Sequence, residues 1–198
     1  MVRDLSSSEC KDCTYYDAVE QCKIGIPSDR THLSPWDILS FSFGGSSLAP
    51  YVPTPCYVVR RMLSLAELKA GEIVYDLGSG DGRIVMLAAG DFGAKAVGFE
   101  CEKDLVKKSL DRIHKFHFNY EVKIIKDDLL NADIDKADVV TMYLSPGGNE
   151  EVKPKLEREL KSGARVISLE FEIQGWKFHK VDKIVDAGLT YTIYVYNR

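Results

Sequence analysis

The sequence predicts an α/β protein built as a three-layer sandwich: a seven-stranded, mostly parallel sheet that closes with a C-terminal antiparallel hairpin. Two observations predict this fold. Between residues 54 and 169, short β-rich runs alternate with helical patterns, as they do in consecutive βαβ units. The final stretch instead holds two β-rich runs, 180–185 and 190–196, with a short turn around Ala187 and Gly188. These runs leave no room for a helix between them, so they should pair as a hairpin.

The elements before the hairpin follow from local signals. Thr54 is a good N-cap and Pro55 suits the first helical position, so a helix is expected to begin there and to stop before Gly71. The other helices are expected through 84–89, over the face shared by Val106, Leu110, Ile113 and His117, and around 150–160 with Gly163 as its stop. The parallel strands are expected at 73–77, 96–100, 122–126, 138–144 and 165–169.

Composition favours one main domain with a short extension. A chain of 198 residues with 45% apolar and 28% charged residues is an ordinary globular protein. A glycine- and serine-rich link at 43–47 places the boundary near Leu48, which gives a cysteine-containing extension over 1–48 and a main domain over 49–198. No transmembrane segment or signal peptide is apparent, so a cytoplasmic location is expected. The net charge of -4 disfavours nucleic acid as a partner and favours a cationic one.

The turn after the first expected strand is rich in glycine. It reads Asp76-Leu77-Gly78-Ser79-Gly80-Asp81-Gly82-Arg83, and its glycines let a ligand approach the backbone at a strand's carboxyl end, as in Rossmann-like folds. A dinucleotide fingerprint would need a glycine at position 83, where arginine stands, so the pattern argues against NAD. It suits a ligand without a pyrophosphate, whose zwitterionic amino-acid end can meet the loop amides and the Asp76 carboxylate. S-adenosylmethionine (SAM) is such a ligand.

Acidic residues follow the next two expected strands. Glu100 ends the strand at 96–100, where a carboxylate can accept hydrogen bonds from both hydroxyls of a ribose. Asp127 and Asp128 follow the strand at 122–126, where one carboxylate can accept a hydrogen bond from an adenine amine. Each feature has a plainer explanation: glycines for a tight turn, Glu100 as a solvated strand end, Asp128 as the cap of a short helix. Because all three occur together and in order, a cofactor site is favoured.

The chain resembles the small archaeal protein-lysine methyltransferases and their relatives that methylate lysines of mitochondrial membrane proteins. Beyond the glycine loop, the resemblance is carried by Tyr51-Val52-Pro53-Thr54-Pro55, Val140-Thr141-Met142-Tyr143-Leu144, Lys153-Pro154-Lys155-Leu156 and Glu170-Phe171-Glu172-Ile173-Gln174-Gly175-Trp176. It implies a class I, Rossmann-like methyltransferase fold, with SAM as the methyl donor. It also implies which residues bind SAM: Asp76, Gly78, Ser79 and Gly80 at the methionine end, Tyr51 and Thr54 folded over that end, Glu100 at the ribose, and Asp128 and Leu129 at the adenine.

The end of the fourth expected strand should form the mouth at which the methyl group is transferred. Enzymes that methylate bases place Asn/Asp-Pro-Pro-Tyr there, whereas this sequence has Tyr143-Leu144-Ser145-Pro146, which disfavours base methylation. A lysine must lose its proton before it attacks, and a desolvating aromatic channel favours the neutral amine. Tyr143 and Trp176 are the candidate walls, although either could simply be a packing aromatic. Glu170 and Glu172 should point to opposite sides of a strand, and Glu170 is the candidate that faces the site.

Three cysteines in the extension have a spacing that occurs in zinc sites. Cys10, Cys13 and Cys22 form Cys-x2-Cys-x8-Cys, which lacks a fourth ligand unless His32 or Cys56 folds back. The spacing also arises by chance, so reduced thiols are the favoured interpretation and no metal site is assigned.

These observations lead to a functional hypothesis: a SAM-dependent methyltransferase that acts on exposed lysines of protein substrates. One alternative is a methyltransferase of RNA or a small molecule, since Lys153, Lys155, Arg158 and Lys161 could begin a basic stripe. The glutamates among them favour an ion-paired, solvated face instead. A second alternative is a non-catalytic SAM-binding scaffold, which the complete set of cofactor residues disfavours.

Overall fold

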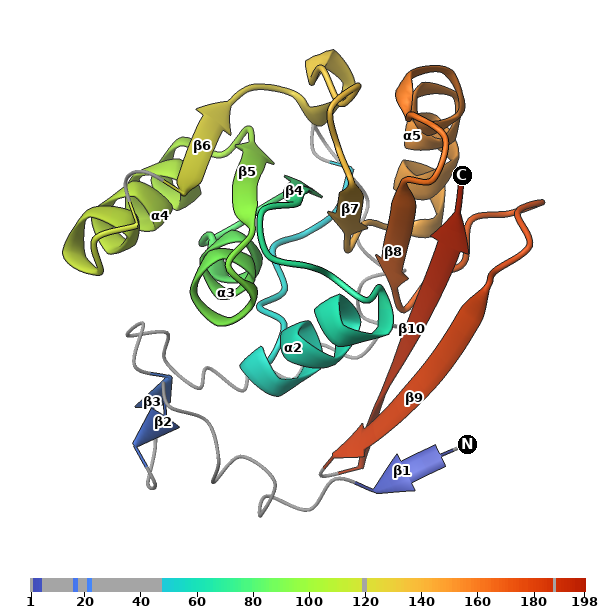
Figure 1. Ribbon diagram of the computed structural model, residues 1–198, viewed down its shortest axis with the longest axis horizontal. Helices are drawn as coiled ribbons and strands as arrows, with labels where there is room; N and C mark the ends of the chain where they lie inside the picture. The colour runs from blue at the N-terminus through green and yellow to red at the C-terminus, as the bar shows by residue number, and fades with distance from the viewer. Residues whose placement is uncertain (1, 5–15, 18–20, 23–47, 119–120, 187) are drawn as a thin grey trace.

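The computed structural model describes residues 2–4, 16–17, 21–22, 48–118, 121–186 and 188–198. In this part of the chain an eight-stranded sheet runs in the order β1-β9-β10-β8-β7-β4-β5-β6 (Figure 1). Its strands are β1 (Val2–Asp4), β4 (Ile73–Leu77), β5 (Lys95–Glu100), β6 (Val122–Lys126), β7 (Val139–Met142), β8 (Arg165–Leu169), β9 (Lys180–Asp186) and β10 (Leu189–Asn197). A separate two-stranded sheet pairs β2 (Tyr16–Asp17) with β3 (Gln21–Cys22).

The sheet confirms the predicted fold class. Strands β4 to β8 pair in parallel, and β10 lies antiparallel to both β8 and β9. The strand order reverses beside β4: the chain proceeds outwards from β4 through β5 to β6, then returns to the other side of β4 with β7. A ligand of a doubly wound sheet binds beyond the carboxyl ends of the strands at such a switch point. Here that point is where Leu77 of β4 lies opposite Met142 of β7.

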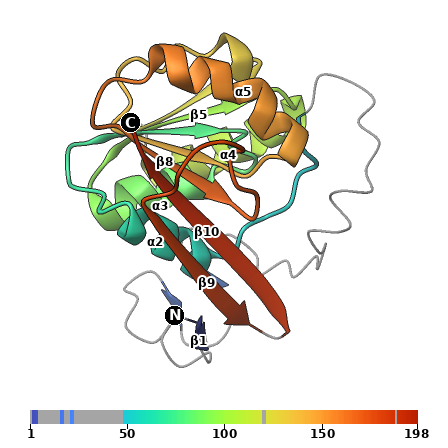
Figure 2. The same ribbon diagram turned by 90° about the vertical axis from the view of Figure 1, so that its right-hand side faces the viewer.

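Helices cover both faces of the sheet (Figure 2). On one face, α2 (Cys56–Leu65), α3 (Arg83–Phe92) and α4 (Lys103–Lys115) contribute to one apolar cluster. On the other face, the 3-10 turn η2 (Leu129–Asn131) and α5 (Pro146–Glu159) contribute to a second one. The result is the expected three-layer sandwich. No helix among the described residues is long and apolar enough to cross a membrane.

The start of α2 differs from the prediction. Pro55 is the N-cap, with an extended backbone (φ -58°, ψ 142°) and no side-chain cap, and the helix begins at Cys56. Because the ψ of Pro55 lies outside the helical region, the helix starts one residue later than expected, and Thr54 stands before the cap. Its carbonyl oxygen instead accepts a hydrogen bond from Arg83 at 2.7 Å.

The predicted buried face of α4 was wrong in part. Leu110 is 46% exposed, and His117 lies beyond the end of the helix at a φ of +62°. Ser109 is fully buried instead, because α4 packs there against the glycine loop: a Cβ on Gly82 would lie 2.9 Å from Ser109 Cβ. The close approach of α4 to the glycine loop thus buries the small residue Ser109, whereas the apolar pattern predicted that its larger neighbour Leu110 would be buried.

The two ends of α5 and one short strand also differ from the prediction. Helix α5 begins at Pro146, earlier than expected, because the Ser145 hydroxyl caps it by accepting a hydrogen bond from the Gly148 amide at 3.0 Å. It ends at Glu159, before Gly163. Strand β1, which the sequence did not predict, adds to the sheet edge in parallel with β9; a strand of three residues is too short to show a period.

Candidate cofactor-binding site

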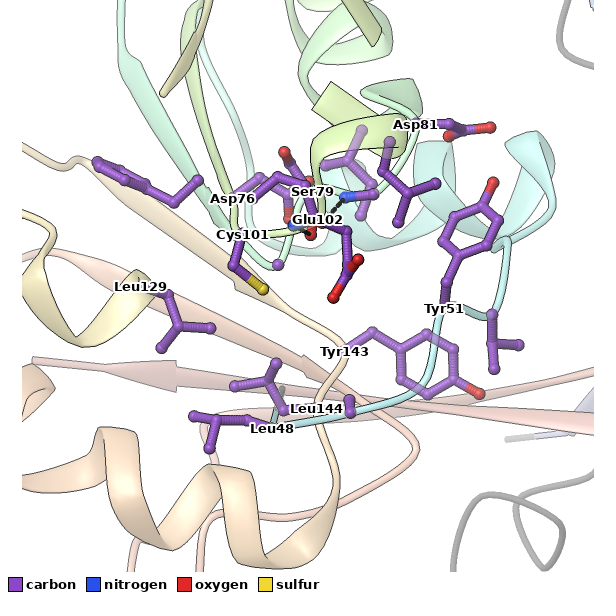
Figure 3. Close-up of a pocket in the computed structure, with 18 of the residues that line it drawn as sticks. Leu48, Tyr51, Asp76, Ser79, Asp81, Cys101, Glu102, Leu129, Tyr143 and Leu144 are labelled. Atoms are coloured by element: carbon purple, nitrogen blue, oxygen red, sulfur yellow. Dashed lines mark hydrogen bonds between the residues drawn. The ribbon is translucent and has the colours of Figure 1, made fainter. Parts of the chain in front are cut away.

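A cavity of about 310 Å³ opens at the carboxyl ends of β4, β5 and β7 (Figure 3). This volume lies at the lower end of the range for small-molecule sites. Its walls come from segments far apart in sequence: 48–54, the glycine loop, 99–102, 127–129, and Tyr143 with Leu144. The lining includes every residue predicted to bind SAM: Tyr51, Thr54, Asp76, Gly78, Ser79, Gly80, Glu100, Asp128 and Leu129.

The glycine loop is tied to strand β5. The amides of Gly78 and Ser79 donate to the Phe99 carbonyl at 3.0 and 2.9 Å, and the amide of Gly80 donates to Glu100 Oε2 at 2.7 Å. Gly80 has a φ of +54°, and a Cβ there would lie 2.8 Å from the Tyr51 ring. Glycine is therefore required for both backbone conformation and space. The amides of Gly78, Ser79 and Gly80 were expected to bind the ligand, but they are hydrogen-bonded within the protein. A ligand would therefore meet the surface of the loop and the Asp76 carboxylate rather than free amides.

Asp76 is the penultimate residue of β4 and is 1% exposed. Its Oδ1 accepts a hydrogen bond from the Thr141 hydroxyl at 2.7 Å, and its Oδ2 is buried with no partner among the described residues. Burial raises the pKa of Asp76 to about 7; the Thr141 hydrogen bond opposes this rise, and the charges of Glu100 and Asp81 add to it. An unpartnered buried carboxylate oxygen is costly unless a cation or donor reaches it. The ammonium group at the methionine end of SAM fits this position.

Glu100 and the aspartates after β6 are oriented by backbone amides. Glu100 Oε1 accepts from the Glu102 amide at 2.9 Å while Oε2 accepts from Gly80, and each oxygen keeps a lone pair for a ribose hydroxyl. Asp128 Oδ1 accepts from the Leu130 amide at 2.9 Å and so caps η2. Asp128 therefore has the capping role considered as its plainer explanation, and it also lines the cavity.

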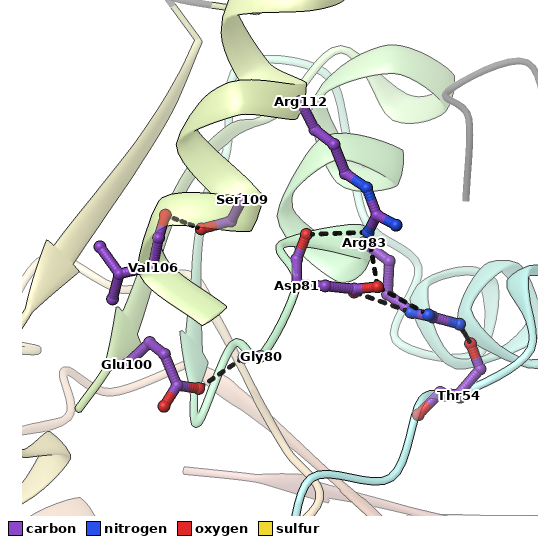
Figure 4. A network of polar contacts seen from close by, with 8 residues as sticks. All are labelled: Thr54, Gly80, Asp81, Arg83, Glu100, Val106, Ser109 and Arg112. Atoms are coloured by element: carbon purple, nitrogen blue, oxygen red, sulfur yellow. Dashed lines mark hydrogen bonds and ion pairs between the residues drawn. The ribbon is translucent and has the colours of Figure 1, made fainter. Parts of the chain in front are cut away.

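A buried ionic network beside the cavity was not predicted (Figure 4). Arg83 donates to both carboxylate oxygens of Asp81, at 2.9 and 2.7 Å, and Arg112 Nη1 donates to Asp81 Oδ2 at 2.5 Å. Burial raises the pKa of Asp81, but hydrogen bonds and charges from the two arginines outweigh it and hold the pKa well below its usual range. From the sequence, Arg83 was interpreted only as the residue that replaces the third glycine of an NAD-binding motif. The apolar run 84–89 was a signal that Arg83 would be buried and would need a carboxylate nearby.

The three candidate catalytic residues are not all together. Tyr143 lines the cavity, and its pKa is raised by burial and by the charge of Glu170. Glu170 follows the end of β8 with a strained φ of +67°, and burial raises its pKa to about 7 against a weak hydrogen bond of 3.3 Å from the Thr192 amide. Neither Glu170 nor Trp176 is among the described lining residues; Trp176 Nε1 donates to Glu157 at 2.8 Å, and the Trp176 ring packs edge-on against Tyr196.

Glu170 and Glu172 do not alternate along a strand as predicted, because β8 ends at Leu169 and both residues lie in the loop that follows. For the cysteines, Cys10 and Cys13 lie outside the described residues. Within the described ranges no group of three or more His, Cys, Asp or Glu residues could hold a metal ion. Cys56 is the first residue of α2 and is buried in the core.

Known proteins resemble the chain over the part that forms this site. A protein-lysine N-methyltransferase of Saccharolobus islandicus (strain REY15A) is 49% identical over 148 residues, which span 74% of this chain and 92% of the relative. An adenine nucleotide translocase lysine N-methyltransferase of Mus musculus is 36% identical over 131 residues, which span 65% of this chain and 56% of the relative. The chain thus covers nearly all of the archaeal enzyme but little more than half of the mouse one.

A solved structure shares the fold. It is described as an RNA methyltransferase from Salinibacter ruber in complex with S-adenosyl-L-homocysteine, and it is 41% identical with a TM-score of 0.69, over 74% of this chain and 93% of that one. The family described as the ANTKMT methyltransferase domain matches residues 76–180, which is more than half of the chain. This match begins at Asp76, at the floor of the cavity, and the chain belongs to that methyltransferase family.

Proposed function

We propose that the chain transfers a methyl group from SAM to the side-chain amine of lysine in protein substrates. The observation that carries this function is the charge of the cavity. Six carboxyl groups line it, and Arg83, the single basic residue among the described lining residues, is already paired with Asp81. The acidic lining is Asp76, Asp81, Glu100, Glu102, Asp127 and Asp128. Such a site favours a cationic methyl donor and a cationic acceptor. The names of the Saccharolobus and mouse relatives support lysine as that acceptor.

Bound SAM would be held by Asp76 at its ammonium group and by Glu100 at its ribose, with Asp128 and Leu129 near the adenine. When bound, it supplies an electrophilic methyl group. The lysine nitrogen, after giving up a proton, would form a bond to the methyl carbon while the carbon–sulfur bond breaks, so that the positive charge passes from sulfur to the methylated nitrogen. This chain's own contribution is to hold the amine in line and to keep water away.

Tyr143 and Glu170 would receive the amine. They follow the adjacent strands β7 and β8, and Tyr143 also packs beside Tyr191 of β10. A carboxyl group with a pKa of about 7 can accept the proton that a lysine must lose near neutral pH. The strained backbone at Glu170 supports a functional role. The contacts of Trp176 with Glu157 and Tyr196 support packing rather than a channel wall.

RNA is the second candidate acceptor, because the Salinibacter ruber structure carries that description at 41% identity. The acidic lining of the cavity argues against a polyanion. So do the contacts of the basic residues on α5 and just after it. Lys155 and Arg158 pair with Glu159 at 2.7 and 2.6 Å, Lys161 pairs with Asp138 at 2.6 Å, and Lys153 donates to the Gln174 carbonyl at 2.5 Å. Nucleic acid is thus disfavoured as a partner.

Incubation of the purified protein with methyl-labelled SAM and a cell extract tests the function. After digestion, mass spectrometry of the labelled species should find methyl groups on lysines of proteins, and an Asp76→Ala variant should transfer none. Label recovered only on RNA or on small molecules would refute the lysine assignment. SAM binding without transfer to any class of acceptor would favour a non-catalytic scaffold.

The cytoplasmic location remains a prediction, which a fluorescent fusion in the native host would test.

A further inference from the structure

The segment 48–54 spans one side of the cavity, and we call it the strap. Hydrogen bonds hold it near both ends. The Leu48 carbonyl accepts from the Ser145 hydroxyl at 2.8 Å, and the Thr54 carbonyl accepts from Arg83 Nη1 at 2.7 Å. Between them, Pro50 and Pro53 have no backbone N–H to donate. The Tyr51 side chain also forms hydrogen bonds with Asp81 and Arg83, so the strap is held at its ends and through Tyr51.

Arg83 is placed to fix one of those ends. It is the first residue of α3, directly after the glycine loop, and it is 7% exposed. Two of its nitrogens form a fork with Asp81 while a third reaches the Thr54 carbonyl (Figure 4). Arg112 of α4 holds Asp81 from the other side at 2.5 Å. A single guanidinium therefore joins the glycine loop to the strap.

The contact matters because the strap and the loop form opposing surfaces of one cavity. The Tyr51 ring of the strap lies so close to Gly80 that a Cβ there would be 2.8 Å from it. Figure 3 shows Tyr51 and Tyr143 on the same side of the cavity, with Asp76 and Ser79 across from them. Displacing the Thr54 end would move Tyr51 and open the cavity on that side.

We propose that Arg83 is a positioning residue for the cofactor: it fastens the strap over the methionine end of SAM without touching the reacting atoms. This inference rests on the proposed function only in taking SAM as the ligand. It does not depend on which substrate receives the methyl group. If it is correct, weakening this one fork loosens the strap and lowers cofactor affinity while the chemistry at saturating cofactor persists.

An Arg83→Lys variant tests this proposal, because lysine keeps the charge but cannot span a carboxylate and a carbonyl with one planar fork. Calorimetry with S-adenosylhomocysteine should show a Kd about tenfold higher or more. Hydrogen exchange of peptides that cover 48–59 should show protection on ligand binding in the wild type and much less in the variant. With an active substrate, KM for SAM should rise by a similar factor while kcat stays within about twofold.

Arg165→Lys is the matched control. Arg165 also donates to a carboxylate, Glu72 at 2.6 Å, and to a carbonyl near the end of α2, Ala66 at 2.6 Å, but at the opposite end of the sheet. The Arg165→Lys variant should bind S-adenosylhomocysteine with unchanged affinity. If Arg83→Lys does not fold, Asp81→Asn removes the charge that orients the arginine and is measured in the same way.

Three results would overturn the proposal: a folded Arg83→Lys with affinity within twofold of the wild type, an equal loss in both lysine variants, or loss of folding in both Arg83→Lys and Asp81→Asn by circular dichroism. The last result would make the cluster part of the core. Failure of lysine methylation with an intact Arg83 effect would refute the proposed function alone.

Discussion

Two carboxyl groups of the site, Asp76 and Glu170, have pKa values that burial raises to about 7. Asp76 lines the cavity, whereas Glu170 is not among its described lining residues but is close enough to Tyr143 for its charge to raise the pKa of that hydroxyl. Both therefore change charge near neutral pH, but with different consequences. Charge on Asp76 should govern cofactor binding and stability, whereas charge on Glu170 should govern the transfer step.

Replacing Asp76 by asparagine should abolish SAM binding and flatten the pH dependence of stability. The folded-state pKa is raised from 3.8 to about 7, so the folded protein binds the proton more tightly than the unfolded chain. Its contribution to stability is therefore present below pH 4 and is lost as the pH rises through 7. Without ligand, the melting temperature of the wild type should fall more between pH 5 and pH 8 than that of Asp76→Asn. Equal slopes would contradict the prediction.

Asp138→Asn is the control with the opposite sign. Partial burial raises the pKa of Asp138, but the hydrogen bonds from Lys161 and the Ile73 amide outweigh it and lower the pKa overall. The contribution of Asp138 is therefore present at neutral pH and is lost as the pH falls. Asp138→Asn should be less stable than the wild type at pH 8, which is the opposite of the effect expected for Asp76→Asn at that pH. It should bind S-adenosylhomocysteine with the affinity of the wild type.

Glu170→Gln should lower kcat about a hundredfold at pH 8, the usual size of a lost acid–base group, with KM for SAM unchanged. In the wild type, kcat should rise with pH up to about 7, because the ionised carboxylate is the form that accepts a proton. Steady-state rates across pH 6 to 9 on a labelled protein substrate measure both effects. Glu172→Gln changes an exposed carboxyl two residues further on and should leave the rates unaltered. A Glu170→Gln variant with wild-type kcat would remove the residue from the mechanism.

At the scale of elements, the strands were more predictable than the helices. β4, β6 and β8 have the predicted bounds, because apolar, β-branched runs end at clear breaks. The face of α4 was not predictable in the same way, since the fit of Ser109 against Gly82 depends on a contact between segments distant in sequence. The same holds for the site. The motif located Asp76 and Glu100, whereas the Arg83–Thr54 contact exists only once α3 and the strap meet.

The contact between the glycine loop and the strap gives an element-scale prediction. Gly80→Ala places a Cβ 2.8 Å from the Tyr51 ring at a φ of +54°, so it should both strain the loop and push the strap outwards. Gly71→Ala imposes a similar backbone strain, with a φ of +83° and no atom within 4 Å of the added Cβ. Gly71→Ala should lose about 1 kcal/mol of stability, and Gly80→Ala should lose more because of the added contact with Tyr51. Calorimetry should find a loss of affinity for S-adenosylhomocysteine in Gly80→Ala alone, and equal affinities would refute the role of this contact.

At the scale of the whole molecule, the residues proposed for the cofactor and for the acceptor come from neighbouring strands of one sheet. β4 and β5 carry Asp76 and Glu100, Tyr143 and Glu170 follow β7 and β8, and Tyr191 of β10 lies near Tyr143. The reversal of strand order beside β4 separates the two groups. Under the proposed function, the fold would hold the two reactants on adjacent halves of one edge. Residues from 48 onwards supply every described lining residue of the cavity.

This arrangement predicts where the chain can be shortened. Removal of residues 1–45 keeps Leu48, whose carbonyl accepts from the Ser145 hydroxyl that also caps α5, and it removes β1 from the edge of β9. The shortened protein should fold with a modestly lower melting temperature and bind S-adenosylhomocysteine with unchanged affinity. Removal of residues 1–50 also deletes Leu48 and half of the strap, so affinity should fall sharply. If both truncations bound equally well, the strap would not be part of the site; if the first failed to fold, the boundary near Leu48 would be wrong.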